Sequence, residues 1–118
     1  MTQVEIWHNP RCSKSRQTLA LLQEHGVEPL IRDYQKEPPS VDELRTMLDA
    51  LGMEPGDVVR RKEALFKEVV GDREPSAEEW LEILHQYPKL IERPIVRSGD
   101  RAVIGRPPER ILELFGNG

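Results

Sequence analysis

Residues 8–16 decide how this chain folds, and they read His8-Asn9-Pro10-Arg11-Cys12-Ser13-Lys14-Ser15-Arg16. Before them, apolar and polar residues alternate as in a short strand, so we expect a strand over residues 2–7. After them, leucines recur at helical spacing and predict a helix over residues 11–25. The stretch is therefore expected to be the junction where a strand passes into a helix.

Asn9 and Pro10 are typical of a helix start, because asparagine can cap free N–H groups and proline fits the first turn. Cys12 is then expected at or near the helix N-terminus. That end carries unpaired N–H groups and partial positive charge, which favour a thiolate and attract oxyanions. Three basic side chains within the stretch add formal positive charge. The pattern indicates a nucleophilic thiolate beside an anion-binding loop.

Cys12 is the only cysteine in the chain. A lone cysteine commonly serves as a small buried hydrophobe. Here its neighbours are asparagine, arginine, serine and lysine, which are poor company for a core, so we favour a reactive residue. A single cysteine also excludes an internal disulfide and a second thiol on the same chain.

The composition is that of one domain, which we expect to span residues 1–118. The formal net charge of -4 disfavours nucleic acid or an anionic membrane as a partner. No apolar run reaches the roughly 20 residues needed to cross a membrane, and the first residues lack the features of a secretory signal. One cysteine and three histidines show no metal-ligand spacing. We therefore expect a cytoplasmic monomer without a bound metal or cofactor.

Residues 28–34 predict a second strand, parallel to the first because a helix connects the two. Two Ser-x-x-Glu capping boxes follow, at Ser40 and Ser76, and each begins a helix with an apolar stripe. A further helix is expected over residues 62–70. Residues from about 38 to 88 thus form a run of helices inserted after the strand–helix–strand unit.

The chain returns to strand character at residues 92–96, and Ser98-Gly99-Asp100 is typical of a hairpin turn. Residues 102–104 are its second strand. A final helix is expected over residues 109–115. The side chains expected to face inward from it are Ile111, Leu112, Leu114 and Phe115. The fold class is α/β: a thioredoxin-like βαβ–(helical insertion)–ββα order with a four-stranded mixed sheet.

Several motifs stand in order along nearly the whole chain. They are His8-Asn9-Pro10-x-Cys12-x-x-Ser15-Arg16, Tyr34, Pro38-Pro39, Asp42-Glu43-Leu44, Arg60, Pro88, Ile91-x-Arg93-Pro94-Ile95-Val96 and Gly105-Arg106-Pro107. With these motifs the chain resembles the arsenate reductases of the glutaredoxin-dependent type. It is most similar to a short branch of that family, with an Arg-Cys-Ser-Lys-Ser-Arg loop and a final Gly-Arg-Pro-Pro-Glu helix.

The resemblance implies a role for each matched residue. Cys12 is the nucleophile that attacks arsenic, and His8 and Ser15 help to keep its thiol ionised. Pro94 matches the cis-proline of thioredoxin-like folds. The three matched oxyanion-binding residues are Arg60, Arg93 and Arg106. Glutathione is the implied co-substrate, and glutaredoxin is the implied partner that regenerates the system as arsenite is released.

Physical chemistry is consistent with these roles. Arsenate is a tetrahedral oxyanion, so an approaching thiolate must overcome like-charge repulsion, which guanidinium groups can offset by hydrogen bonding. Arg61 adjoins Arg60 and offers the same charge, and the motif favours Arg60. Because the chain has one cysteine, an outside thiol must resolve the adduct of Cys12 with arsenic.

Two other functions stay open. The Cys-Ser-Lys-Ser loop also resembles a monothiol glutaredoxin centre, which would act on a glutathione mixed disulfide instead of arsenate. A relative of this fold regulates transcription by binding RNA polymerase, usually through a Cys-x-x-Cys switch. Ser15 stands where the second cysteine of that switch would be, and this disfavours the regulatory function.

Overall fold

The structure is a computed structural model that describes residues 3–115, which form two compact units. The first unit consists of residues 3–37 and 93–115, and the second of residues 38–92. Among the described residues, none of the helices is both long enough and apolar enough to cross a membrane.

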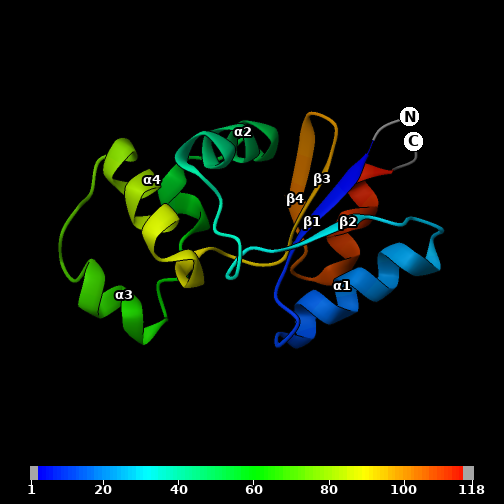
Figure 1. The fold of residues 1–118 in the computed structure, drawn as a ribbon, viewed down its shortest axis with the longest axis horizontal. Helices are drawn as coiled ribbons and strands as arrows, with labels where there is room; N and C mark the ends of the chain where they lie inside the picture. Colours follow the sequence, from blue (N-terminus) through cyan, green and yellow to red (C-terminus); the bar gives the residue numbers. More distant parts are fainter. Residues whose placement is uncertain (1–2, 116–118) are drawn as a thin grey trace. The chain divides into compact units, whose positions relative to one another are not determined.

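The first unit is built on a four-stranded sheet with the strand order β2-β1-β3-β4 (Figure 1). The strands are β1 (Val4–His8), β2 (Leu30–Asp33), β3 (Ile95–Ser98) and β4 (Arg101–Ile104). β1 is parallel to β2 and antiparallel to β3, and β3 is antiparallel to β4. The helix α1 (Ser13–Glu24) connects the parallel pair. The predicted mixed sheet and the βαβ–helices–ββα order are confirmed.

The predicted elements extend beyond the observed ones by one to three residues at several ends, the largest difference being the strand predicted from residue 92, which begins at Ile95. The strand expected over residues 2–7 is Val4–His8, and residue 2 lies outside the described part of the chain. The strand expected over residues 28–34 is shorter, and the predicted hairpin has a two-residue turn in which Gly99 has a φ of 64°. That left-handed value suits glycine because it has no Cβ.

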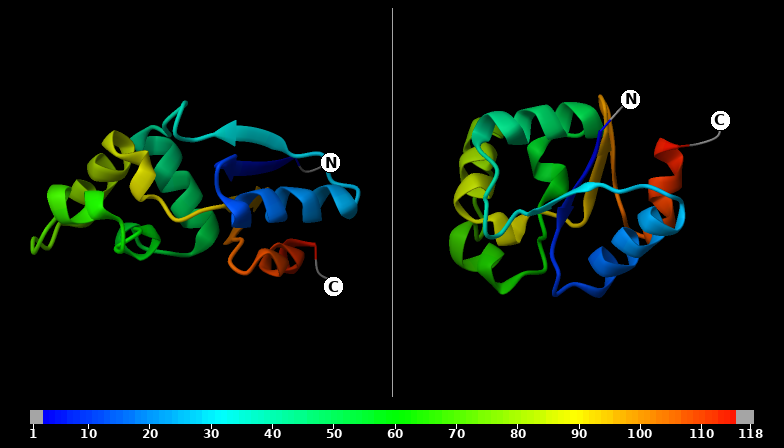
Figure 2. Two further views of the ribbon diagram at one scale, coloured as in Figure 1. Left: turned by 90° about the horizontal axis from the view of Figure 1, so that it is seen from below. Right: turned by 45° about the vertical axis from the view of Figure 1, so that its right-hand side comes forward.

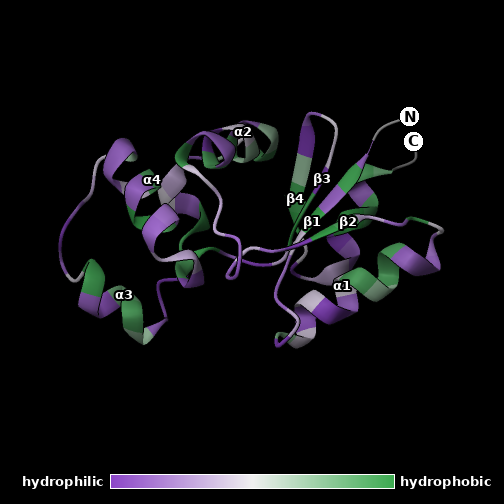
Figure 3. Cartoon of the chain, viewed as in Figure 1, coloured by the Kyte–Doolittle hydropathy of each residue, from purple (hydrophilic) through white to green (hydrophobic). Residues whose placement is uncertain are grey.

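The core of the first unit lies between the sheet and two helices, α1 and the 3-10 helix η3 (Pro108–Leu114) (Figure 2). Its buried residues are Val4, Ile6, Leu22, Val96 and Ile111, each at most 7% exposed. Burial of each such side chain stabilises the fold by about 1.5–3 kcal/mol. Figure 3 shows the corresponding hydrophobic colouring on β1 and along part of α1. This core fixes the start of α1 relative to the strands.

The last helix differs from its prediction. Ile111 is fully buried and Leu114 packs against the core, but Leu112 and Phe115 are 36% and 41% exposed. The expectation that these two side chains face inward is wrong. The reason is the helix type: a 3-10 helix has three residues per turn, so positions 111 and 114 share one face.

The second unit contains only short helices. They are α2 (Val41–Leu51), η1 (Pro55–Val58), α3 (Ala64–Val69), α4 (Ala77–Gln86) and η2 (Pro88–Leu90). Both predicted capping boxes are confirmed: the Glu43 N–H donates to Ser40 Oγ at 3.1 Å, and the Glu79 N–H donates to Ser76 Oγ at 3.2 Å. The helix expected over residues 62–70 is the shorter α3.

Candidate active site

Cys12 lies at the junction of β1 and α1 and is the N-cap residue of the helix. The prediction that Cys12 lies at the helix N-terminus is confirmed, but the helix expected from residue 11 begins at Ser13, and Asn9 does not cap it. The Asn9 side-chain oxygen accepts a hydrogen bond from the Arg11 N–H at 3.0 Å, and the Asn9 backbone carbonyl accepts one from the Cys12 N–H at 3.0 Å. These bonds make residues 9–12 a turn and delay the helix to Ser13. Cys12 therefore sits directly at the free N–H groups of the first helical turn.

The surroundings of Cys12 favour its thiolate. Burial raises the pKa of the Cys12 thiol, but hydrogen bonds from the Ser15 N–H, the Arg93 guanidinium and the Lys14 N–H lower it more. The charge of Arg93 adds to this effect, and the pKa lies below its ordinary value. Cys12 is only partly buried. A partly exposed cysteine with a lowered pKa is a good nucleophile.

Arg93 precedes β3 and is joined to Pro94 by a cis peptide bond. Its Nε and Nη1 atoms are buried, and neither has a hydrogen-bond partner among the described residues. A buried donor without a partner costs about 1–3 kcal/mol. These two nitrogens of Arg93 can therefore donate hydrogen bonds to a bound anion.

His8 and Ser15 form a buried pair behind Cys12. His8 Nδ1 lies 2.6 Å from Ser15 Oγ, and the Asn9 N–H donates to the same oxygen at 3.0 Å. Ser15 is fully buried and His8 is 7% exposed. Burial lowers the pKa of His8, the Asp33 carboxylate partly opposes this, and the Arg16 charge lowers it further.

The lowered pKa favours the neutral form of His8 at pH 7. His8 Nδ1 and Ser15 Oγ share one hydrogen bond, whose donor depends on the histidine tautomer, and Ser15 Oγ also accepts from the Asn9 N–H. A neutral histidine supplies no charge to the thiolate. The pair instead holds Ser15 in place, and the Ser15 N–H is one of the donors to the sulfur.

Arg106 belongs to the same unit and follows β4. Its side chain is exposed, its N–H donates to the Ile104 carbonyl at 2.9 Å, and its bond to Pro107 is cis. The preceding residue, Gly105, donates its N–H to the Pro94 carbonyl at 2.9 Å. The turns that carry Arg93 and Arg106 are therefore hydrogen-bonded to each other.

Arg60 lies in the second unit, where all three guanidinium nitrogens have partners. Nη2 is 2.9 Å from Glu63 Oε2, Nη1 donates to the Lys89 carbonyl at 3.3 Å, and Nε is 4.0 Å from Glu92 Oε1. Sequence analysis missed these carboxylates. Glu63 follows Arg60 by three residues, a spacing that signals an ion pair on a helical turn, whereas nothing local indicates Glu92.

Arg61, the neighbour that offers the same charge, has a different setting. Its guanidinium lies 5.6 Å from the Phe66 ring centre and 5.5 Å from that of Trp80, and it donates to the Gly56 carbonyl at 2.8 Å. These contacts are a cation–π arrangement that ties η1 to α3 and α4. The guanidinium of Arg61 therefore has a structural role in packing the second unit.

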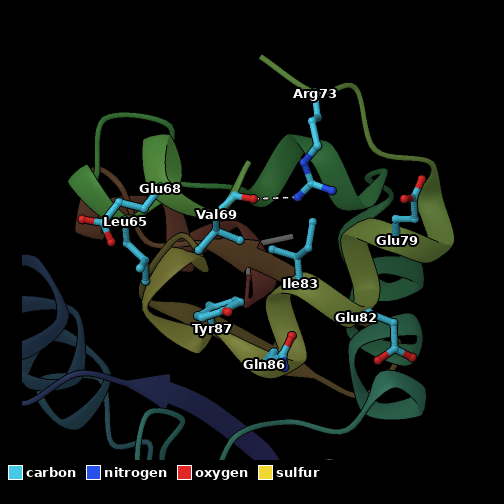
Figure 4. Close-up of a pocket in the computed structure, with 9 residues that line it drawn as sticks. All are labelled: Leu65, Glu68, Val69, Arg73, Glu79, Glu82, Ile83, Gln86 and Tyr87. Carbon is cyan, nitrogen blue, oxygen red and sulfur yellow. Dashed lines mark hydrogen bonds between the residues drawn. The ribbon is translucent and has the colours of Figure 1, made fainter. Parts of the chain in front are cut away.

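The second unit also has an open cavity of about 620 Å³ lined from α3 and α4 (Figure 4). Three exposed carboxylates stand at it, those of Glu68, Glu79 and Glu82. Its one arginine, Arg73, donates to the Val69 carbonyl at 2.6 Å. This charge pattern repels oxyanions, so the cavity is not a candidate for the anion site.

Comparisons with known proteins agree with this geometry. The ArsC family model matches residues 7–114. The uncharacterized protein YfgD of Escherichia coli K12 is 48% identical over 116 residues, which cover 97% of this chain and 98% of that protein. An arsenate reductase of Haemophilus influenzae is 44% identical over 114 residues, which cover 95% of this chain and 98% of that protein.

A solved structure is also similar over most of its length. An arsenate reductase from Vibrio cholerae matches with a TM-score of 0.90 and 46% sequence identity, covering 95% of this chain and 97% of that one. This similarity, together with the sheet order, confirms the predicted thioredoxin-like fold class.

Proposed function

Because the chain belongs to the ArsC family, we propose that it reduces arsenate to arsenite with the Cys12 thiolate as nucleophile. The observation that supports this most is that two buried nitrogens of Arg93, Nε and Nη1, have no hydrogen-bond partner among the described residues. The same arginine lowers the pKa of Cys12 and so favours its thiolate. A thiolate beside unsatisfied cationic donors suits an anionic substrate that is attacked at its central atom.

The proposal gives each of the other site residues a role. Arg106 is exposed on a turn that is hydrogen-bonded to the Pro94 carbonyl, which suits a second oxyanion ligand. Arg60 is paired with Glu63, so in our proposal an oxyanion takes the place of that carboxylate when Arg60 binds it. His8 and Ser15 act by holding the Ser15 N–H on the sulfur.

The electron count requires an outside thiol. Reduction of arsenic(V) to arsenic(III) takes two electrons, which two thiols supply when they join in a disulfide. The chain has one cysteine, so at least one of these thiols comes from elsewhere. We propose glutathione as that thiol, with glutaredoxin reducing the mixed disulfide between Cys12 and glutathione and so returning Cys12 to its thiol form. We also propose that the protein acts as a monomer without a bound cofactor, in the cytoplasm, because such thiols are kept reduced there.

A coupled assay tests the proposal. NADPH oxidation is followed with glutathione reductase, glutathione and glutaredoxin, with and without arsenate. We expect arsenate-dependent oxidation with the wild type and none with Cys12→Ser. Arg93→Ala should lose most activity, while Arg97→Ala should keep it, because Arg97 Nε donates to the Gly99 carbonyl at 2.7 Å within the hairpin.

The assay also separates the proposal from its alternative. A folded wild-type protein without arsenate-dependent oxidation, in a mixture where a known arsenate reductase is active, would contradict the proposal. Adding a glutathionylated peptide in place of arsenate then tests the monothiol oxidoreductase, which would use the same Cys12 thiolate. Turnover of the peptide alone would establish that function instead.

A further inference from the structure

Gly105 is a glycine for reasons of space. Among the described glycines, four have φ values between 60° and 78°, and Gly56 and Gly105 do not. The backbone of Gly105 would thus accept any residue. A Cβ there, however, would lie 2.8 Å from Thr18 Oγ1, 3.1 Å from Thr18 Cγ2 and 3.1 Å from Pro94 Cγ. These distances are shorter than the 3.4–4 Å of ordinary contact.

The three segments that meet at Gly105 each carry a residue of the candidate site. Thr18 lies in α1, which begins directly after Cys12, and is fully buried. Pro94 follows Arg93, and Gly105 precedes Arg106. The segments are also bonded: the Gly105 N–H donates to the Pro94 carbonyl at 2.9 Å.

Thr18 completes this junction. Its hydroxyl donates to the Lys14 carbonyl at 2.8 Å and lies 3.4 Å from the Gly105 carbonyl. Its side chain therefore touches the turn before Arg106 while it stays attached to the first turns of α1. Neither Thr18 nor Gly105 has a hydrogen bond to Cys12 among the described contacts, so any effect on the thiol is transmitted through other groups.

We propose that Thr18 and Gly105 are positioning residues whose contact sets how closely Arg93 and Arg106 approach Cys12. The inference deepens the proposed function, since the groups it positions are the proposed nucleophile and two of its arginines. One added methyl group at position 105 must push the segments apart by about 0.6 Å to bring 2.8 Å to ordinary contact at 3.4 Å. Arg93, which lowers the pKa of Cys12, then moves away from the sulfur, and its effect on the thiolate weakens with distance.

The test is a double-mutant cycle read out by the pH profile of Cys12 alkylation with iodoacetamide. Gly105→Ala should raise the apparent pKa of Cys12 by about half a unit to one unit, with up to a tenfold loss of alkylation rate below the pKa for each unit. Thr18→Ala leaves a gap at the same contact and should also raise the pKa. The double variant, in which the new methyl group occupies that gap, should return towards the wild-type profile.

Gly56→Ala is the matched control. A Cβ on Gly56 would lie 3.2 Å from Trp80 Nε1, which is milder crowding, in the second unit. We expect it to lower thermal stability and leave the Cys12 profile unchanged. If Gly105→Ala does not fold by circular dichroism, Thr18→Ala and the double variant carry the test.

Unchanged profiles in the folded single variants would overturn the inference, as would a double variant shifted by the sum of the two single shifts. The profile needs no arsenate, so the outcome is independent of the proposed function. Wild-type arsenate turnover with unchanged profiles refutes only the positioning role. A compensating cycle without arsenate turnover refutes only the reductase.

Discussion

Replacing Arg93 with methionine should stabilise the free protein and remove its affinity for oxyanions. Methionine keeps an unbranched apolar stem but has no N–H groups. Arg93 has two buried nitrogens without a partner among the described residues, and each such donor costs about 1–3 kcal/mol. The variant removes this cost. It also removes the hydrogen bond to Cys12, which solvent weakens because Cys12 is partly exposed.

The size of the gain follows from these terms. Arg93 is only partly buried, so the lower end of the range applies, or about 2 kcal/mol for the two donors together. Loss of the bond to Cys12 subtracts about 1 kcal/mol. The free energy of unfolding should therefore rise by about 1 kcal/mol, and Tm by about 3–5 °C for a chain of this length.

Thermal unfolding with and without sulfate measures both effects, because sulfate is a tetrahedral dianion that thiols do not reduce under these conditions. Sulfate should raise the Tm of the wild type, because binding at ten times the Kd of sulfate adds about 1.4 kcal/mol to the free energy of unfolding. It should add nothing for Arg93→Met beyond the non-specific effect of the salt. The control Arg97→Met should lose a little stability, since Arg97 Nε donates to the Gly99 carbonyl, and should keep the response to sulfate. A lower Tm for Arg93→Met with an undiminished sulfate response would refute the reasoning.

Three further predictions concern the His8–Ser15 pair behind the thiol and a helix cap in the second unit. Ser15→Ala leaves His8 Nδ1 and the Asn9 N–H without their partner, so urea unfolding should show a loss of about 1–3 kcal/mol; no loss would mean that the pair contributes little. Burial lowers the pKa of His8, so the unfolded chain binds the proton more readily than the folded protein does. The free energy of unfolding should therefore fall as the pH drops below about 6.5, and it should fall less in His8→Asn. Parallel curves of unfolding free energy against pH for the two proteins would contradict this. Ser76→Ala removes the acceptor of the Glu79 N–H, so urea unfolding should show a loss of about 1 kcal/mol in the free energy of unfolding. The pH profile of Cys12 alkylation should not change. A changed profile would contradict the independence of this helix cap from the thiol.

Features that depend on neighbours in sequence could be predicted. The alternation in β1 and the capping boxes at Ser40 and Ser76 are local signals, and they placed the elements within one or two residues. The start of α1 was predicted two residues too early because an asparagine side chain can either cap a helix or form a turn, and here Asn9 accepts from the Arg11 N–H in a turn. Leu112 was misplaced because apolar spacing does not distinguish a 3-10 helix from an α-helix over two turns.

In the candidate site, too, features set by neighbours in sequence could be predicted and features set by distant segments could not. The position of Cys12 follows from the strand and helix on either side of it, and this could be read from the residues. The unpartnered nitrogens of Arg93 and the crowding at Gly105 depend on segments far apart in the chain. Such contacts leave no periodic or local signal. Motif matching and charge indicated Arg93 as an oxyanion ligand, and the motif included Gly105, but neither predicted the missing partners of Arg93 or the crowding at Gly105.

The most direct test of the central claim is to measure the arsenic itself. Wild type and Cys12→Ser are incubated at equal concentration with arsenate, glutathione and glutaredoxin, and arsenite is separated from arsenate and quantified. We expect arsenite in molar excess over the wild-type protein and only the protein-free background with Cys12→Ser. Equal arsenite from both proteins would contradict the account, because Cys12 would then not be the group that attacks arsenate.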